Sequence, residues 1–549
     1  MTAAMAWCFA ALWDAVAEAI PDAPAVAEGA IRRTWRTHED RAARLAGALV
    51  AAGLGPDSKV AIYGYNSAAY VEALYAVLKA RCTPVNVNYR YAEQELTYLF
   101  DNADAEAVIF DARFGPRLAA ILPSLPKLKL LVEIDDGSGE RLPQAARLEA
   151  LAETCPPLAP RDYSEDDILM LYTGGTTGLP KGVMYRQGDY SRAMLAGFDR
   201  MGLPRPATRE ELQDAVRRLQ AEGRAPVSTP ACPLMHGTGQ NGGVLMPHAM
   251  GGCVVLFRNT RFDADALWRL VEAEAVSDLT IVGDAFARPM LDALEAAEAA
   301  GRPYDVSSLR RILSSGVMFS RETKEGLLRF ADITIMDSMG ASEGGMAVSV
   351  VSRASPPGET ARFVANPSTR VFREDGREVT PGSDEVGLIA NGGFSPIGYY
   401  KDPEKTAATF RVIDGQRYSF PGDFARVAAD GGLILLGRGS NCINTGGEKV
   451  FPEEVEEALK AHPAVADALV VGLPDPRFGE RIVAVVAAAP GEAPDEAALI
   501  AAVRARLADY KRPRAIVFAD EVRRAPNGKA DYAWAKATAA GALAPAEAG

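Results

Sequence analysis

Residues 168–182 read ILMLYTGGTTGLPKG, an apolar run that leads into a loop rich in glycine and threonine and then into a lysine. The apolar part predicts a buried strand. Glycines let backbone amides approach an anion closely, threonine hydroxyls add donors, and the lysine adds a positive charge. Leu179 and Pro180 separate Gly178 from Lys181, whereas in the Walker A pattern the lysine follows the glycine directly. The stretch therefore predicts a phosphate-binding loop of another type.

Strand-like and helix-like segments alternate along the chain around this loop. Buried strands are predicted at 59–64 and 105–110, with a helix between them at 68–81. Such alternation is typical of an α/β domain with largely parallel sheets. From 361 to 436, short strands separated by Gly, Asp and Pro predict a small antiparallel, barrel-like β lobe. After Gly439 the pattern indicates an α+β domain of about 110 residues, so we expect an α/β protein with a large multi-lobed N-terminal domain and a smaller C-terminal one.

Composition and charge narrow the class of protein. The chain has 549 residues, of which 59 are Lys or Arg and 72 are Asp or Glu, so its net charge is −13. A negative surface repels nucleic acid and anionic membranes, and no nucleic-acid partner is expected. The six cysteines form no CxxC pair and there are four histidines, which argues against a disulfide framework or zinc site and for a reducing cytoplasm. No uncharged apolar run reaches 18 residues, so no transmembrane segment is expected.

The apolar run at residues 3–13 allows two interpretations, the core of a signal peptide or the start of an amphipathic helix. No Lys or Arg precedes it, and Asp14 and Glu18 follow at helical spacing. These features favour a helix that ends near Pro21.

Further short motifs follow the phosphate loop in a fixed order. They read PLMHG at 233–237, DSMGASE at 337–343, PGD at 421–423, GRGS at 437–440, NTGGEKVFP at 444–452 and PNGKADY at 526–532. Together with the phosphate loop they resemble the motifs of the adenylate-forming superfamily, which includes acyl-CoA synthetases, peptide-synthetase adenylation domains and luciferases. The resemblance covers roughly residues 10 to 540.

The resemblance implies a two-step reaction with ATP, Mg²⁺ and coenzyme A. A carboxylate attacks the α-phosphorus of MgATP to give an acyl-adenylate and pyrophosphate, and the CoA thiolate then displaces AMP. Glu343 would hold Mg²⁺, because a hard cation prefers carboxylate oxygen, and Lys529 would position the attacking carboxylate. Thr176 and His236 complete the implied catalytic residues.

The resemblance also implies a nucleotide site. Asp423 would accept hydrogen bonds from the ribose hydroxyls, since an ionised acceptor suits a vicinal diol. Met339 stands where the family usually has an aromatic residue along the adenine, and Ser342 stands in place of threonine. The residues implied for ATP and AMP are Thr173, Gly174, Gly175, Thr176, Thr177, Gly178, Lys181, Ser315, Gly316, Asp337, Ser338, Met339, Gly340, Ser342, Asp423, Arg438 and Lys529.

The acyl pocket is expected beside His236, with Gly237 and Gly316 at its border. Glycines 239, 242 and 243 follow His236, and they indicate either a roomy acyl pocket or a flexible loop.

The second half-reaction implies a rotation of the C-terminal domain. Gly446 and Gly447 would then approach the pantetheine arm of CoA. Ser440 occupies the family's hinge position, where Asp or Lys is usual. The implied division is an N-terminal domain at 1–437, a hinge at 438–440 and a C-terminal domain at 441–549.

Flanking phrases such as GYYKDPEKTA and ALVVGLPDPRFG resemble acyl-CoA synthetases of the actinobacterial steroid side-chain group and related fatty-acid CoA ligases. The implied substrate is a hydrophobic carboxylic acid, activated in the cytoplasm, with a homodimer as an assembly to test. Two alternatives stay open. The acyl group could pass to the phosphopantetheine of a carrier protein, or the chain could be a non-catalytic nucleotide-binding scaffold.

Overall fold

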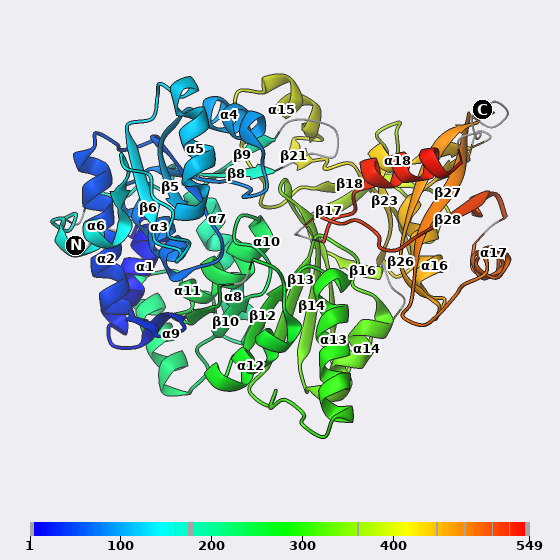
Figure 1. Cartoon of the computed structure of the whole chain (residues 1–549), viewed down its shortest axis with the longest axis horizontal. Helices are drawn as coiled ribbons and strands as arrows, with labels where there is room; N and C mark the ends of the chain where they lie inside the picture. Colours follow the sequence, from blue (N-terminus) through cyan, green and yellow to red (C-terminus); the bar gives the residue numbers. More distant parts are fainter. Residues whose placement is uncertain are drawn as a thin grey trace. The chain divides into compact units, whose positions relative to one another are not determined.

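The computed structural model describes residues 5–543 except 160, 174–179, 259, 359–361, 446–447, 476–478, 508 and 526–527 (Figure 1). The chain forms two compact units. The first comprises Met1–Thr360 and Gly392–Ser419, and the second comprises Ala361–Asn391 and Phe420–Gly549. The predicted boundary at 438–440 lies inside the second unit, because the strands at 362–391 group with the C-terminal part of the chain.

One sheet of the first unit contains the strand that leads into the phosphate loop. Its order is β19 (Gly398–Tyr399), β9 (Lys181–Arg186), β8 (Ile168–Thr173), β4 (Thr83–Asn86), β3 (Lys59–Tyr63), β5 (Ala105–Asp111), β6 (Leu130–Ile134) and β7 (Ala146–Arg147). The strands from β8 to β7 run parallel, whereas β9 pairs antiparallel with both β8 and β19. The predicted strands at 59–64 and 105–110 are therefore confirmed as buried neighbours.

The second sheet of this unit contains the strands that border the nucleotide motifs. It runs β2 (Ile31–Thr34), β1 (Pro24–Glu28), β11 (Cys253–Leu256), β10 (Val227–Pro230), β12 (Asp278–Ile281), β13 (Arg311–Ser315), β14 (Thr334–Ala341) and β15 (Gly344–Val351). From β1 to β14 neighbouring strands are parallel, and β14 turns back into β15. Helices α12 (Ala264–Glu274), α13 (Asp284–Ala299) and α14 (Arg321–Phe330) bury one apolar core against this sheet (Figure 1).

The remaining helices of the first unit surround these sheets (Figure 1). They are α1 (Phe9–Ala19), α2 (Trp35–Ala51), α3 (Ala68–Lys79), α4 (Glu93–Asn102), α5 (Gly115–Ile121), α6 (Leu148–Thr154), α7 (Gln187–Met194), α8 (Ala196–Arg200), α9 (Arg209–Ala221), α10 (Gly237–Gln240), α11 (Met246–Ala249) and α15 (Pro403–Thr409). A hairpin of β20 (Phe410–Ile413) and β21 (Gln416–Ser419) follows α15. Helix α1 is largely buried and matches the predicted amphipathic helix, which ends at Ala19.

The second unit combines an antiparallel β lobe with an α+β sheet. The lobe contains β16 (Arg362–Ala365), β17 (Thr369–Phe372), β18 (Gly387–Asn391), β22 (Asp423–Val427) and β23 (Leu433–Arg438). The α+β part contains β24 (Ile443–Thr445), β25 (Glu448–Val450), β26 (Val465–Asp475), β27 (Gly479–Ala488) and β28 (Ala515–Ala519), with α16 (Pro452–Lys460), α17 (Glu496–Arg504) and α18 (Tyr532–Ala542). Its helices pack on opposite faces of the long β26–β27 hairpin and give it cores of its own. The predicted α/β class is confirmed.

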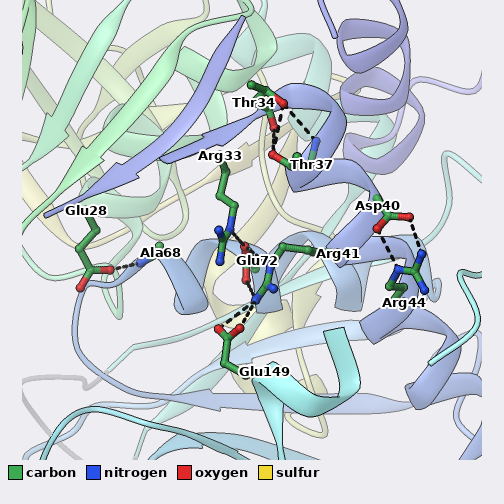
Figure 2. A network of polar contacts seen from close by, with 10 residues as sticks. All are labelled: Glu28, Arg33, Thr34, Thr37, Asp40, Arg41, Arg44, Ala68, Glu72 and Glu149. Atoms are coloured by element: carbon green, nitrogen blue, oxygen red, sulfur yellow. Dashed lines mark hydrogen bonds and ion pairs between the residues drawn. The ribbon is translucent and has the colours of Figure 1, made fainter. Parts of the chain in front are cut away.

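A buried ion cluster joins α2 to α3 and α6 (Figure 2). Glu72 on α3 is 2% exposed and accepts hydrogen bonds from Arg33 Nε (3.1 Å) and Arg41 Nε (2.8 Å). Arg41 also contacts Glu149 on α6 at 2.9 Å. A carboxylate in this position compensates two guanidinium groups that are largely withdrawn from water.

Replacing Glu72 with glutamine is expected to lower the free energy of unfolding of the first unit by about 3 kcal/mol, because it leaves a buried charge uncompensated. Urea denaturation measures the difference. The matched control is Asp40→Asn, which weakens the more exposed Asp40–Arg44 pair of Figure 2 and should cost much less, because solvent screens an exposed pair. Equal losses in the two variants would contradict the cluster's importance.

Two histidines lie in the core among aromatic side chains. His38 and His248 are fully buried, with ring centroids 5.6 Å apart, and both pack edgewise against Trp35. His248 Nε2 lies 3.0 Å from the carbonyl oxygen of Ala25, and burial lowers the pKa of both imidazoles to about 3. In the folded protein both rings are therefore neutral near pH 6.

This burial predicts a loss of stability in mild acid. In the unfolded chain both histidines have a pKa of about 6.5 and bind protons below that pH, whereas in the folded chain they stay neutral. The free energy of unfolding therefore decreases as the pH falls. The loss should approach about 1.4 kcal/mol per pH unit for each histidine. Urea midpoints measured from pH 7.5 to 5 test this slope, and His38→Phe should make it shallower. An unchanged slope in that variant would count against the account.

Candidate active site

The phosphate loop leaves one strand and returns on the next. Thr173 ends β8 and Lys181 begins β9, and the two are register partners. Gly174, Gly175, Thr176, Thr177 and Gly178 lie outside the described residues. Asn86 fixes the entry to the loop, because its side chain donates to the carbonyl of Tyr172 (2.9 Å) and accepts from the amide of the same residue (2.7 Å).

Lys181 is the cationic residue at the end of the loop, and it contacts Tyr399 and Asp402, which are far from it in the sequence. Its Nζ lies 2.8 Å from Asp402 Oδ2 and 5.8 Å from the centre of the Tyr399 ring. The side chain is 40% exposed, so the ammonium remains open to solvent and to an anionic ligand. Asp402 also caps α15 by accepting from the amide of Lys405.

Glu343 occupies the tip of the β14–β15 hairpin. Ala341 and Gly344 are paired across the hairpin, so Ser342 and Glu343 form its two-residue turn. Ser419 Oγ donates to the Glu343 carbonyl at 2.9 Å, and the Tyr185 hydroxyl donates to the Ser342 carbonyl. The Tyr399 hydroxyl donates to Glu343 Oε1. The carboxylate is therefore displayed on a turn that side-chain hydroxyls fix in place.

The strand before this turn alternates between two environments. Asp337 and Met339 are buried on one face of β14, while Ser338 and Gly340 lie half-buried on the other. Asp337 Oδ2 accepts from Lys324 Nζ at 2.8 Å, and burial still raises the pKa of this carboxyl. Its carboxylate thus serves an ion pair with α14, so a nucleotide contact from Asp337 would have to come from its backbone.

Open space lies beside the end of the adjacent strand β13. Ser315 pairs with Ser338 in the parallel register, which brings these two nucleotide motifs side by side. Gly316 follows with φ +95°, and a Cβ atom there would meet only Val282 at 3.8 Å. A side chain at this position would be strained and would occupy the space next to β13.

Asp423, predicted to bind ribose, and Arg438, another predicted nucleotide residue, lie on paired strands of the second unit. Asp423 on β22 is the register partner of Arg438 on β23. The residues on both sides of Arg438 are glycines, and a larger residue would clash at either position. A Cβ atom on Gly437 would lie 2.1 Å from the Glu453 carboxylate, and one on Gly439 would lie 2.5 Å from the Phe424 ring. The side chains of Arg438 and Ser440, and the residues Gly446 and Gly447, are outside the described part of the structure.

Lys529 closes a tight turn in the second unit. The Ala525 amide donates to the Lys529 carbonyl at 2.8 Å, and Gly528 takes a φ of +72°. Arg524 anchors the start of this turn through two hydrogen bonds to Asp467, the shorter of 2.6 Å. The Lys529 side chain itself is exposed. These hydrogen bonds tie the residues on both sides of 526–527 to the second unit and place Lys529 at its surface.

His236 precedes α10 and is half-buried, with Gly237 after it. The glycines that follow permit close packing. A Cβ on Gly239 would lie 2.4 Å from the Pro233 carbonyl oxygen, one on Gly242 would lie 2.3 Å from Leu313, and one on Gly243 would lie 2.5 Å from Pro230. The glycines at 239, 242 and 243 therefore permit close packing of these helical turns. Gly242 also lines the cavity described next, so the expectation of an acyl pocket beside them stays a prediction.

An apolar cavity lies beneath these helical turns. It encloses about 470 Å³ between its atoms, open solvent at its mouth included. Its lining residues are Gly197, Arg200, Met201, Pro226, Gly242, Met246, Pro247, Met250, Asp278, Leu279, Thr280, Arg311, Ile312, Leu313 and Met336. His236, Gly237 and Gly316 are not among them. Four methionines contributed by segments far apart in the chain meet here, which no local sequence pattern indicates.

The chain belongs to the AMP-binding enzyme family. The model of that family matches residues 13–395, and the model of the AMP-binding enzyme C-terminal domain matches residues 454–529.

Characterised relatives match nearly the whole chain. A 3-oxocholest-4-en-26-oate–CoA ligase of Rhodococcus rhodochrous is 44% identical, covering 97% of this chain and 96% of the relative. A medium/long-chain-fatty-acid–CoA/3-oxocholest-4-en-26-oate–CoA ligase of Mycolicibacterium smegmatis is 42% identical, with the same coverage. The medium-chain acyl-CoA ligase Mig of Mycobacterium avium is 41% identical, covering 96% and 97%.

Solved structures share the fold. The anthranilate CoA ligase AuaEII in complex with anthranoyl-AMP superposes with a TM-score of 0.82 at 21% identity, covering 98% of this chain and 99% of the other. A benzoate CoA ligase from Burkholderia xenovorans LB400 gives a TM-score of 0.80 at 23% identity, covering 96% and 99%.

Proposed function

We propose that this enzyme converts a hydrophobic carboxylic acid, either a fatty acid or a steroid side-chain acid, into its CoA thioester. The enzyme is an AMP-forming acid–thiol ligase that uses ATP, Mg²⁺ and CoA. The observation that carries the choice of acid is the methionine-lined cavity, which adds an apolar compartment to the nucleotide motifs. Relatives at 41–44% identity are named for fatty acids and for a cholestenoate.

The position of the cavity suits an elongated acid. Its lining includes Asp278 and Arg311, which begin β12 and β13, whereas Ser315 and Gly316 stand at the other end of β13. Five residues of strand span about 17 Å. A carboxylate near Gly316 would therefore leave its apolar body to extend along the sheet toward Arg311. The free space is narrow, but flexible methionine side chains can move apart for a ligand.

The residues present fit the magnesium ion that the reaction needs. In the described ranges no three His, Cys, Asp or Glu side chains gather as a dedicated metal cage. Glu343 alone displays a carboxylate at the hairpin tip, and Mg²⁺ is commonly bound by one or two carboxylates together with substrate phosphates. Bound there, the ion would neutralise phosphate charge.

Other residues of the chain would bind the phosphates and the ribose and align the carboxylate. Lys181 would hold a phosphate oxygen as a point charge once it leaves Asp402. Asp423 would bind the ribose hydroxyls, and Lys529 would align the carboxylate with the α-phosphorus during adenylation. For the second step we propose that the part of the chain after the hinge at 438–440 rotates, so that Lys529 leaves and Gly446 and Gly447 approach CoA. His236 and Thr176 remain proposed catalytic residues.

We propose that the enzyme is located in the cytoplasm. Among the described residues, no helix has the length and apolar character that crossing a membrane requires. All six cysteines are free, and four of them are buried, which supports a reducing cytoplasm. A homodimer is proposed as the assembly to test by light scattering.

A carboxylate panel tests the choice of acid. Release of AMP with CoA is measured for acetate, octanoate, palmitate, an aryl acid and a steroid side-chain acid. We expect kcat/KM for the best long or steroid acid to exceed that for acetate at least about 100-fold, since each buried methylene contributes roughly 0.8 kcal/mol. A preference for acetate would contradict the proposal.

The same assay separates the alternatives. Replacement of free CoA by a holo carrier protein tests the carrier-loading reaction. Turnover that depends on the carrier and not on CoA would favour it. Absence of any acid-dependent AMP release in this panel would instead favour the non-catalytic scaffold.

A further inference from the structure

The segment GYYKD at 398–402 lies beside the phosphate-loop strand. Gly398 and Tyr399 form β19 and pair antiparallel with Met184 and Val183 of β9. The Tyr400 amide also donates to the Gly182 carbonyl at 2.8 Å. The segment therefore continues the sheet past β9, next to the start of that strand at Lys181.

Strand geometry places Lys181, Tyr185 and Tyr399 on the same face of this sheet edge. Lys181, Val183 and Tyr185 are every second residue of β9, and Tyr399 is the register partner of Val183. Side chains two apart on a strand, and those directly opposite across a pair, share a face. Tyr185 and Tyr399 accordingly both reach the Ser342–Glu343 turn.

Three hydroxyl groups hold that turn, but they hold different parts of it. Tyr185 and Ser419 donate to the backbone carbonyls of Ser342 and Glu343. Tyr399 instead donates to the side-chain oxygen Oε1 of Glu343, so among the described contacts its hydroxyl is the group that touches this carboxylate. Its ring is 6% exposed and packs 5.7 Å from the Phe410 ring, so the hydroxyl is held in place.

We propose that Tyr399 is a positioning residue that orients the Glu343 carboxylate toward the magnesium ion of MgATP, an inference that rests on the proposed function. The phenol occupies a lone pair of Oε1 and leaves Oε2 for the metal. Carboxylates that bind metals are commonly fixed by such an outer hydrogen bond, and its removal typically weakens metal affinity or activity 10- to 100-fold, as an order of magnitude.

The test is Tyr399→Phe, which keeps the ring and removes only the hydroxyl. Calorimetry measures the Kd for ATP with Mg²⁺ and, separately, for ATP with EDTA. We expect the Kd with Mg²⁺ to rise about 10-fold and the metal-free Kd to stay within about twofold. The adenylation rate should fall and recover partly as Mg²⁺ is raised. A purely structural role would instead weaken both forms of ATP equally, and that result would overturn the proposal.

The neighbouring tyrosine supplies a matched control. Tyr400 donates its hydroxyl to Asp104 at 2.7 Å, away from Glu343, so Tyr400→Phe should leave both Kd values unchanged. A double variant separates a positioning role from a folding defect. In a Glu343→Gln background, Tyr399→Phe should cause no further loss of Mg²⁺-dependent ATP affinity, because Tyr399 acts through the Glu343 carboxylate. Additive losses would refute the proposal. If the unmodified enzyme failed to bind MgATP, the proposed function itself would fall.

Discussion

Replacing Lys529 with alanine is expected to lower carboxylate-dependent exchange of pyrophosphate into ATP by about 10²–10³-fold. The lysine would supply a positive charge where the attacking carboxylate meets the α-phosphate, and loss of one such preorganised group typically costs that much. The side chain is exposed on a hydrogen-bonded turn, so its truncation should leave the fold intact. Thioester formation from a supplied acyl-adenylate should be largely retained, because Lys529 serves the first step.

Lys536→Ala is the control for this experiment. Lys536 is an exposed lysine on α18 of the same unit, only seven positions further along the chain. Its removal subtracts the same charge from the same region and should change exchange less than twofold. If Lys529→Ala kept the exchange rate of the unmodified enzyme, the assignment of Lys529 would be wrong.

Glu343→Gln should reduce pyrophosphate exchange by at least about 10²-fold. The carboxylate would hold the ion that neutralises developing phosphate charge, an effect worth several kcal/mol, and each 1.36 kcal/mol corresponds to a factor of about ten in rate. Glutamine can still accept the Tyr399 hydrogen bond, so the loss reports the charge and not the position of the turn. Initial rates at a series of Mg²⁺ concentrations measure it.

Glu322→Gln serves as the comparison, because Glu322 is an exposed carboxylate in the first turn of α14. It should leave the Mg²⁺ dependence unchanged. If Glu343→Gln behaved like this control, magnesium binding would have to be assigned to another residue.

The sequence predicted the features that depend on local order. Alternation of apolar strands and helices between 59 and 110 indicated the parallel sheet, and the structure confirms it. The motif at 337–343 indicated a site at Glu343, and the hairpin tip is a place where a carboxylate can be displayed. Both follow from short-range patterns, which a single sequence records directly.

Long-range contacts were not predictable in the same way. Lys181 and Asp402 are 221 residues apart, and Tyr399 and Glu343 are 56 apart, so no periodicity connects either pair. The cavity likewise assembles Met201, Met246 and Met336 from different elements. The sequence also left two interpretations open for the glycines at 239, 242 and 243, because a glycine needed for close packing looks the same in sequence as one that leaves room.

Asp337 illustrates a further limit of motif reading. Its place in the motif implied a nucleotide contact, while its buried carboxylate in the structure forms an ion pair with Lys324. A motif records which residue is present and does not distinguish a side-chain role from a backbone role. Only the alternation along β14 together with the position of α14 separates the two.

The central claim, that the acid is activated as an acyl-adenylate before CoA attacks, is tested most directly by isotope transfer. The enzyme is incubated with ATP, Mg²⁺, CoA and a hydrophobic acid labelled with ¹⁸O in its carboxylate, and the products are weighed by mass spectrometry. The account predicts one ¹⁸O atom in AMP and none in pyrophosphate, because a carboxylate oxygen bonds to the α-phosphorus and leaves with it. Label in inorganic phosphate, with ADP as the nucleotide product, would contradict it.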